Sequence, residues 1–263
     1  MPYALSALLG LVLGALLNVL ADDLPARRAP RLPVCGNCGR THPPHYWLAV
    51  GAYLFGGRCV HCGAPIRLRH VLTELTSALI VVYLWNRFGA TTQFVFTAAI
   101  VAGLLLITVI DVEHRLILRV VVYPAMIIAL IAGLLDPSKG AVKTLVGGAV
   151  GFGLTYLLYL LGGLFSLAVA KMRGRELHEI AFGGGDVNLA GFIGLAVGWS
   201  GILFALFIAV IAGGLGGAIY LLVMILRRKA SLFMAIPYGP FLALGGLVML
   251  LWGKELATWY LGR

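Results

Sequence analysis

The chain has 263 residues, of which 61% are hydrophobic and 11% are charged, and it carries a formal net charge of +10. This scarcity of charge excludes an ordinary soluble domain, in which about a quarter of the residues are charged. The composition instead predicts an all-α polytopic membrane protein, because runs of roughly 17–25 apolar residues can cross a lipid bilayer as helices.

About eight such runs follow one another along the chain. The first, residues 3–21, has no basic segment before it and no A-x-A cleavage site, so we expect a retained helix and not a removed signal peptide. The run 187–199 is short, and we count it as a thin span. The others cover residues 71–85, 94–110, 116–135, 144–170, 201–226 and 232–252.

The basic residues indicate how these helices are oriented. Fifteen of the twenty Lys and Arg residues lie in four alternate loops, residues 22–70, 111–120, 171–185 and 227–229. Cytoplasmic loops are enriched in Lys and Arg, so we expect these four loops in the cytoplasm and the N-terminus outside. Without the thin span, the last basic cluster would lie outside, against this rule. Because the positive charge follows the topology, we expect no nucleic-acid partner.

Residues 22–70 form the only long polar insertion, between the first and second predicted helices, and they hold all four cysteines. The cysteines form two C-x-x-C pairs, Cys35 with Cys38 and Cys59 with Cys62. Two such pairs can surround one tetrahedral Zn²⁺ with four thiolates, a closed site that stabilises folding and leaves no position for chemistry. We therefore predict a small cytoplasmic domain with one structural zinc ion.

Other uses of the four cysteines are weaker. Two disulfides would need an oxidising compartment, whereas the basic residues place the insertion in the reducing cytosol. A redox-active C-x-x-C pair is also less favoured, because two pairs at this spacing more often bind metal. His42, His45 and His61 lie nearby as substitute ligands, but four thiolates already complete the set.

Two carboxylates stand at the ends of predicted helices, and the topology puts both on the cytoplasmic side. Asp111 ends the third apolar run, and Asp186 opens the sixth directly after Gly183, Gly184 and Gly185. A charge beside hydrocarbon is costly, so it indicates a functional site by default. The glycines leave a strip of backbone without side chains, which lets an extended peptide or a second carboxylate approach.

If the two carboxylates meet, they form a coupled pair that shares one proton. The ionised partner then activates water while the protonated partner donates to a peptide carbonyl, as in aspartic proteases. Two simpler interpretations stay open. Asp111 can be a helix-end charge that reaches the membrane interface, and Asp186 can be an N-cap of its helix.

The order of these motifs resembles the type IV prepilin peptidase family, a group of GxGD membrane aspartyl proteases. The three glycines and Asp186 match the GxGD motif, and Asp111 matches the aspartate that opens the family's other catalytic segment. The paired C-x-x-C motifs and Glu74 occur in the family's order. Further similar segments are Gly14-Ala15-Leu16-Leu17-Asn18-Val19, Gly198-Trp199 and Ile236-Pro237-Tyr238-Gly239-Pro240-Phe241-Leu242-Ala243.

The resemblance implies Asp111 and Asp186 as catalytic aspartates in the inner membrane of a bacterial cell. It implies a prepilin or pseudopilin substrate with a basic leader and an apolar helix, cut at the cytoplasmic boundary. Many members with the zinc-bearing insertion also methylate the new N-terminus with S-adenosylmethionine. Glu74 then belongs either to that activity or to helix packing, for instance by pairing with Arg69.

The chain departs from the family's sequence pattern at Leu118, Arg119 and Asn188. These departures bear on which leader sequences are preferred. Both aspartates are still present. We expect a first transmembrane helix (1–21), a zinc-binding domain (22–70) and a membrane-embedded peptidase domain (71–263).

Two other functions stay open. An ion-coupled transporter with a regulatory zinc module would relay ions through the two aspartates, but the fourth, fifth and seventh runs hold no deep ionisable residue that continues such a path. A membrane scaffold that binds partners through its zinc domain would tolerate the loss of either aspartate.

Overall fold

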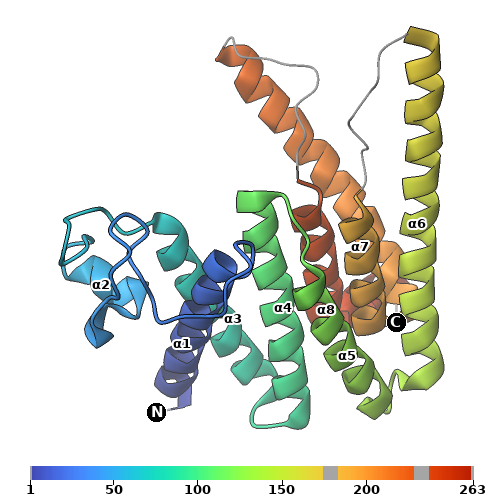
Figure 1. Cartoon of the computed structure of the whole chain (residues 1–263). Coiled ribbons are helices and arrows are strands. Elements are labelled where there is room, and N and C mark those ends of the chain that lie inside the picture. The colour runs from blue at the N-terminus through green and yellow to red at the C-terminus, as the bar shows by residue number, and fades with distance from the viewer. Residues whose placement is uncertain (1, 174–182, 228–236, 262–263) are drawn as a thin grey trace. The chain divides into compact units, whose positions relative to one another are not determined.

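The computed structural model describes residues 2–173, 183–227 and 237–261, and within these ranges the regular elements are helices (Figure 1). The chain forms two compact units, Met1–Ala102 and Gly103–Arg263. The prediction of an all-helical membrane protein with a four-cysteine insertion between its first and second spans is confirmed.

In the first unit, α1 (Pro2–Asp23) packs against α3 (Leu68–Phe88). The two helices approach closely because a Cβ on Gly10 or Gly14 would collide with the backbone of α3. Small residues allow such close helix contacts in lipid. The insertion between these helices contains η1 (Pro44–Tyr46) and α2 (Ala49–Leu54), and the unit ends in the first part of α4 (Thr92–His114).

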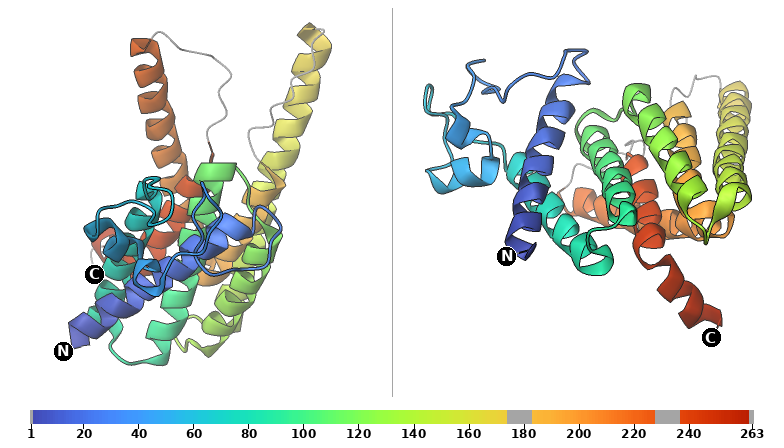
Figure 2. Two further views of the ribbon diagram at one scale, coloured as in Figure 1. Left: turned by 60° about the vertical axis from the view of Figure 1, so that its left-hand side comes forward. Right: turned by 90° about the horizontal axis from the view of Figure 1, so that it is seen from below.

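The second unit holds the rest of α4, followed by α5 (Arg119–Leu135), α6 (Gly140–Arg173), α7 (Gly184–Leu226) and α8 (Gly239–Leu261). α7 is the centre of this unit, because α5, α6 and α8 all pack against it (Figure 2). Residues 187–196 of α7 are buried apart from a half-buried Asn188. The first part of α7 therefore forms the core of the unit.

α7 is a run of 43 helical residues whose backbone turns at Gly198. Gly198 has φ 81° and ψ 175°, a conformation that is open to glycine and strained for other residues. The two halves run in different directions on either side of it (Figure 1), so they correspond to the predicted spans 187–199 and 201–226. Nζ of Lys139 donates to the carbonyl of Ala196 at 2.7 Å, which satisfies a group that the turn exposes.

The first half of α7 packs closely against α6 because glycines lie at the contact between the two helices. A Cβ on Gly147 of α6 or on Gly194 of α7 would collide with the backbone of the other helix. Gly151 meets the backbone of Ala190 in the same way, about one helical turn further along. These contacts leave the first half of α7 little freedom to move against α6.

Within the described ranges, six helices are long and apolar enough to cross a bilayer, namely α1, α3, α4, α6, α7 and α8, while α5 is apolar but has 17 residues. The last predicted span, 232–252, corresponds to α8 from Gly239 onward. Residues 174–182 of the predicted cytoplasmic loop, Arg228, Lys229 and Ile236 lie outside the described residues.

Candidate functional sites

The first candidate site is the four-cysteine cluster of the insertion. The sulfur atoms of Cys35, Cys38, Cys59 and Cys62 all lie within 4.8 Å of one another. The Sγ atoms of Cys35 and Cys62 are 3.7 Å apart, and those of Cys38 and Cys59 are 4.0 Å apart. Thiolates bound at about 2.3 Å to a tetrahedral Zn²⁺ would be roughly 3.8 Å from one another. The residues present therefore fit one zinc ion, and none of the four forms a disulfide.

The two C-x-x-C segments have the same backbone geometry. The N–H of Gly39 donates to the carbonyl of Cys35, and the N–H of Gly63 donates to that of Cys59, both at 2.9 Å. Gly39 and Gly63 have φ of 69° and 70°, in the left-handed region that favours glycine. Local hydrogen bonds in each segment thus set the positions of the sulfur atoms.

Cys62 is the exposed member of the cluster. A hydrogen bond from the backbone N–H of Ala64, followed by one from the side chain of Asn37, lowers the pKa of the Cys62 thiol to about 6. Nδ2 of Asn37 lies 3.7 Å from Sγ of Cys62. Because the thiolate is the form that binds metal, Cys62 is a ready ligand at neutral pH, whereas the pKa of the Cys38 thiol is raised to about 11.

Glu74, for which the sequence left two roles open, lies on α3 and is only 1% exposed. Its carboxylate accepts hydrogen bonds from the N–H groups of Ala49 (2.8 Å) and Val50 (2.9 Å), the first residues of α2. A carboxylate at a helix N-terminus satisfies N–H groups that have no partner within the helix. Glu74 therefore ties the insertion to α3, while Arg69 bonds to Asp22.

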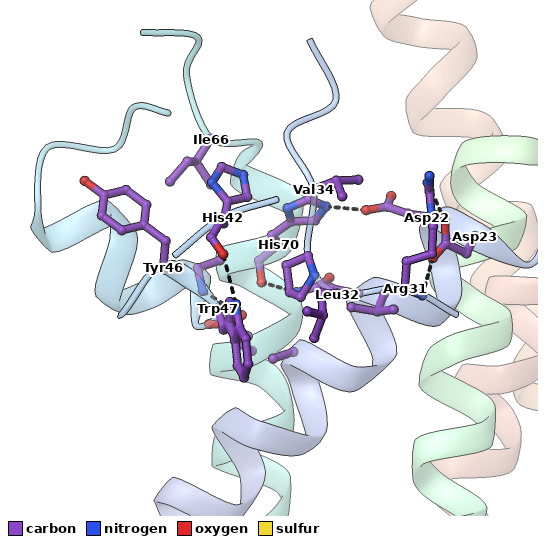
Figure 3. A pocket seen from close by; sticks show the side chains of 16 residues that line it. Asp22, Asp23, Arg31, Leu32, Val34, His42, Tyr46, Trp47, Ile66 and His70 are labelled. Atoms are coloured by element: carbon purple, nitrogen blue, oxygen red, sulfur yellow. Dashed lines mark hydrogen bonds and ion pairs between the residues drawn. The ribbon is translucent and has the colours of Figure 1, made fainter. Parts of the chain in front are cut away.

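A cavity lies beside Glu74, between α1, α3 and the insertion (Figure 3). It has a volume of about 60 Å³ and opens to solvent. The rings of Tyr46, Trp47, His42 and His70 line it. Nδ1 of His42 is buried and has no hydrogen-bond partner within the described part of the chain. The sequence did not predict this cavity, because its walls come from three separate segments.

The second candidate site lies in the second unit and contains both predicted aspartates. Asp111 lies near the C-terminal end of α4 and Asp186 in the first turn of α7, and they are 5% and 8% exposed. Asp111 lies against Gly239 at the beginning of α8, and the end of α4 and the beginnings of α7 and α8 lie at a similar height in Figure 1. The two carboxylates are close enough to interact electrostatically. The structure thus brings together the two residues that the sequence predicted as a pair.

Asp186 is held by the glycine that precedes its helix. The N–H of Gly183 donates to Oδ2 of Asp186 at 2.9 Å, and the N–H of Asp186 donates to the carbonyl of Gly183 at 3.0 Å. The first bond is the half of a capping box in which a carboxylate at the third helical position accepts from the N-cap N–H, whereas Gly183 has no side chain to complete the box. The carboxylate therefore helps to begin α7, and the same bonds orient it.

Asp111 has a different environment. Its Oδ2 is buried and accepts no well-aligned hydrogen bond from a described residue. Gly239, the first residue of α8, lies so close that a Cβ there would collide with the carboxylate and would be 3.1 Å from its Cγ. A helix N-terminus carries partial positive charge, which offsets part of the cost of burying Asp111. Buried polar atoms without a partner are rare in folded proteins, and a catalytic role is one explanation for such an atom.

The three glycines before Asp186 have different surroundings and different roles. Gly183 caps the helix, as described above. A Cβ on Gly185 would be 2.7 Å from Cβ of Ile117, in the connection between α4 and α5, whereas Gly184 faces open space. The expected strip of bare backbone is therefore accessible at Gly184, whereas the side chain of Ile117 covers it at Gly185.

Gly239, Tyr238 and Ile117 belong to this site, although the sequence analysis assigned them no role. Ile117 lies between two glycines, since added Cβ atoms on Gly185 and Gly239 would both meet it. Burial, followed by the charge of Asp186, raises the pKa of the Tyr238 phenol, so this ring lies within electrostatic range of the site. The sequence did contain one signal for Tyr238 and Gly239, because the segment around them resembles a segment of the family.

Two buried carboxylates within electrostatic range of each other, at the ends of membrane helices, are the arrangement expected of a membrane aspartic peptidase. Comparison with known proteins agrees with this class. The Type IV leader peptidase family matches residues 98–218, which include both aspartates. The Bacterial Peptidase A24 N-terminal domain matches residues 8–88, which include the cysteines and Glu74.

Similar proteins cover almost the whole chain. A prepilin leader peptidase/N-methyltransferase of Pseudomonas aeruginosa is 31% identical over 280 residues, which cover 97% of this chain and 91% of the relative. Proteins of the same name from Legionella pneumophila and Bacillus subtilis are each 27% identical, covering 99% and 96% of this chain and 94% and 95% of their own lengths. No solved structure matches the chain.

The chain belongs to the type IV leader peptidase family, Peptidase A24. This membership confirms the family recognised from the order of the motifs and the prediction of a membrane peptidase. It also confirms a multi-pass membrane protein of a bacterial family.

Proposed function

We propose that this chain is a membrane aspartic endopeptidase that removes the leader of type IV prepilins or pseudopilins, with Asp111 and Asp186 as its catalytic pair. The observation that carries the proposal is that these two buried carboxylates lie within electrostatic range of each other in the second unit. The names of the relatives supply the substrate class. The substrate would present a basic leader and an apolar helix, with the cut at the cytoplasmic boundary.

The chemistry follows from two carboxylates that share one proton. The ionised carboxylate takes a proton from water as the water oxygen attacks the carbonyl carbon of the scissile peptide. The protonated carboxylate donates its proton to the carbonyl oxygen. When the tetrahedral intermediate collapses, the C–N bond breaks and the leaving amine takes a proton from the carboxylate that accepted one from water. The proton on the carbonyl oxygen then returns to its donor, so the pair again shares one proton.

The backbone around the pair supports access by an extended peptide. Gly184 faces open space beside Asp186. Gly239 brings a stretch of backbone without a side chain to the carboxylate of Asp111. A substrate strand laid against these glycines would have its carbonyl within reach of both acids, which is the positioning that such catalysis needs.

Co-expression with a candidate prepilin, followed by mass spectrometry of the substrate's N-terminus, tests the proposal. The unmodified chain should yield a product without its leader. Asp111→Asn and Asp186→Asn should each leave the leader in place, because an amide cannot exchange the shared proton. Both variants should remain folded and metal-loaded, and normal cleavage by either one would contradict the proposed roles.

We also propose that the chain methylates the new N-terminal amine with S-adenosylmethionine and holds one structural zinc ion at its four cysteines. The names of the relatives include N-methyltransferase activity, and the sulfur spacing suits zinc. The same mass spectra would show the added methyl group. Metal analysis of purified protein should give about one zinc per chain.

We further propose an inner-membrane location with the N-terminus outside and the insertion in the cytoplasm. The alternation of Lys and Arg along the chain supports this orientation. Cys62, which is exposed, supplies a direct test. In metal-depleted vesicles, a membrane-impermeant thiol reagent should label it only from the cytoplasmic face, and labelling from outside would reverse the topology.

A further inference from the structure

We infer that the end of α2 and the turn after it are a lipid-binding surface, which seats the four-cysteine insertion on the bilayer. Tyr53, Leu54 and Phe55 enter the boundary of the hydrocarbon, and Arg58 contacts the phosphates of anionic lipids. We call these four residues the α2 tip. The inference concerns the first unit alone and does not depend on the proposed peptidase or methyltransferase activity.

The α2 tip exposes apolar side chains in the long polar segment of the chain. Leu54 is 82% exposed, Phe55 69% and Tyr53 49%, whereas Ala49 and Ala52 on the same helix are buried. Neighbouring exposed apolar residues of this size mark a site that binds a membrane or another protein. The position of α2 distinguishes these two partners.

The α2 tip has a defined conformation. The hydroxyl of Tyr46 donates to the carbonyl of Phe55 at 3.3 Å, and the N–H of Gly57 donates to the carbonyl of Ala52 at 3.1 Å. Gly56 and Gly57 have φ of 107° and 64°, so the chain turns back directly after Phe55. The apolar side chains are therefore held at the end of a tight turn.

The hydrogen bonds to Glu74 set the depth of α2 in the membrane. Glu74 lies about 9 Å along α3 from Leu68, at 1.5 Å per residue. α3 has 21 residues, enough to cross a hydrocarbon core of about 30 Å. The first N–H groups of α2 bond to Glu74, so α2 begins within the length of this helix and packs beside it (Figure 1). Helices at the membrane interface bury their apolar face by about 5–10 Å, which agrees with this depth.

The surface of α3 indicates that lipid is present at the same depth. Leu72, Leu75 and Leu79 are 62%, 44% and 72% exposed, and residues three and four apart share one face of a helix. An exposed apolar stripe on a membrane-spanning helix faces lipid tails. Leu72 and Leu75 lie on either side of Glu74 in the sequence, so this stripe passes the level at which α2 begins. The partner that this position favours is therefore the bilayer itself.

The insertion also has the charge that an anionic membrane surface attracts. It contains seven arginines and two aspartates, a formal charge of +5 with neutral histidines. Both aspartates are paired within the unit, Asp23 with Arg31 and Asp22 with Arg69. Arg58 is exposed and forms no ion pair with a described residue. Arginines near a membrane surface are attracted to anionic headgroups, so Arg58 is placed to bind one.

Photo-crosslinking of the full chain tests the inference, in nanodiscs made of equal parts of phosphatidylethanolamine and phosphatidylglycerol. The residue p-benzoylphenylalanine in place of Leu54 bonds covalently to its neighbour on illumination, and mass spectrometry identifies the adduct. The same probe in place of Leu79, which is exposed in the middle of α3, is the positive control. Phospholipid adducts should form at both positions.

Lipid adducts at Leu79 without any at Leu54 would overturn the inference. A crosslink from Leu54 to a second copy of the chain, or to a purified prepilin added to the nanodiscs, in place of lipid would also overturn it, because the α2 tip would then bind protein. Phe55 is a second position for the probe. A variant that fails to fold at Leu54 therefore does not end the test.

Arg58→Gln tests the contribution of charge. It should lower the ratio of phosphatidylglycerol to phosphatidylethanolamine among the adducts at Leu54 by up to about fivefold, the effect of one basic residue near an anionic surface. Arg87→Gln is the matched control, because it removes the same charge at the opposite end of α3 and should leave the ratio unchanged. The same ratio in Arg58→Gln as in the unmodified chain would overturn the contact between Arg58 and lipid headgroups.

Discussion

The four-cysteine cluster and the aspartate site are built in opposite ways. The cluster is local, because residues 35–62 contain every ligand and two short hydrogen-bonded turns aim the sulfur atoms. The aspartate site is assembled from the ends of three helices, with Asp111 on α4, Asp186 on α7 and Gly239 on α8. A cluster of four cysteines can therefore be predicted from spacing, whereas a pair of carboxylates on separate helices depends on helix packing.

The two sites also differ in what they do for the fold. A structural metal site contributes directly to folding free energy. Two buried carboxylates cost folding free energy, because each loses hydration and each disfavours the charge of the other. Variants of the first site should therefore lose stability, whereas variants of the second should lose activity and keep the fold.

The largest effect should follow from removing one buried thiolate. Cys59→Ser should release the metal and remove a contribution of order 10 kcal/mol to the folding of the insertion. Zinc analysis and hydrogen exchange of residues 35–66 would measure the loss. Asp186→Asn is the contrasting variant, and it should keep both the zinc and the exchange protection. An equal loss of zinc from the two variants would break the comparison.

A methyl group at the start of α8 should have the next largest effect. Gly239→Ala places a Cβ against the carboxylate of Asp111, and such overpacking costs about 1–3 kcal/mol. A displaced catalytic group loses up to about 100-fold in rate, so cleavage should fall roughly 10- to 100-fold. Initial rates on a purified prepilin would measure it.

Gly184→Ala is the matched control for that variant. Its Cβ would enter open space and it lies in the first turn of α7, so the fold should not change. A modest rise in KM is expected if the substrate strand passes there. Normal cleavage by Gly239→Ala would show that α8 does not position Asp111.

Glu74→Gln should have a smaller and local effect. The amide places an N–H₂ group where a carboxylate oxygen now accepts from Ala49 or Val50, so about 1.5–3 kcal/mol of stabilisation should be lost. Hydrogen exchange of residues 49–54 would report the loosened helix α2. Glu255→Gln, at an exposed position on α8, should leave that exchange unchanged. Intact protection in Glu74→Gln would refute the tie between the insertion and α3.

The smallest effect concerns pH. The folded state lowers the pKa of Cys62 to about 6. The Cys62 thiolate therefore contributes to zinc binding above about pH 6, and this contribution is lost as the pH falls through that value. Zinc retention against a fixed chelator should therefore be full at pH 7–8 and decline below about pH 6. Asn37→Ala removes one of the hydrogen bonds to Cys62 and should move the decline to higher pH. If zinc retention falls at the same pH in Asn37→Ala and in the unmodified chain, the hydrogen bond from Asn37 does not lower the pKa of Cys62.

Much of the fold and of both sites could be predicted from the sequence. Apolar runs marked the helices, C-x-x-C spacing marked the cluster, and unusual charges beside apolar runs marked Asp111 and Asp186. The role of Gly239 could not be predicted, because a glycine carries no chemical signal until its neighbours are known. The capping of α2 by Glu74 was likewise hidden, since donor and acceptor lie 24 or more residues apart.

The sequence by itself determined the helical class, the membrane location and the cysteine cluster, because hydropathy and short spacings act over a few neighbouring residues. Only the tertiary structure decided that Asp111 lies against Gly239 and within electrostatic range of Asp186, that α7 turns at Gly198, and that a cavity opens beside Glu74. Each of these features arises where elements distant in the chain pack together, and local preference carries no information about such contacts.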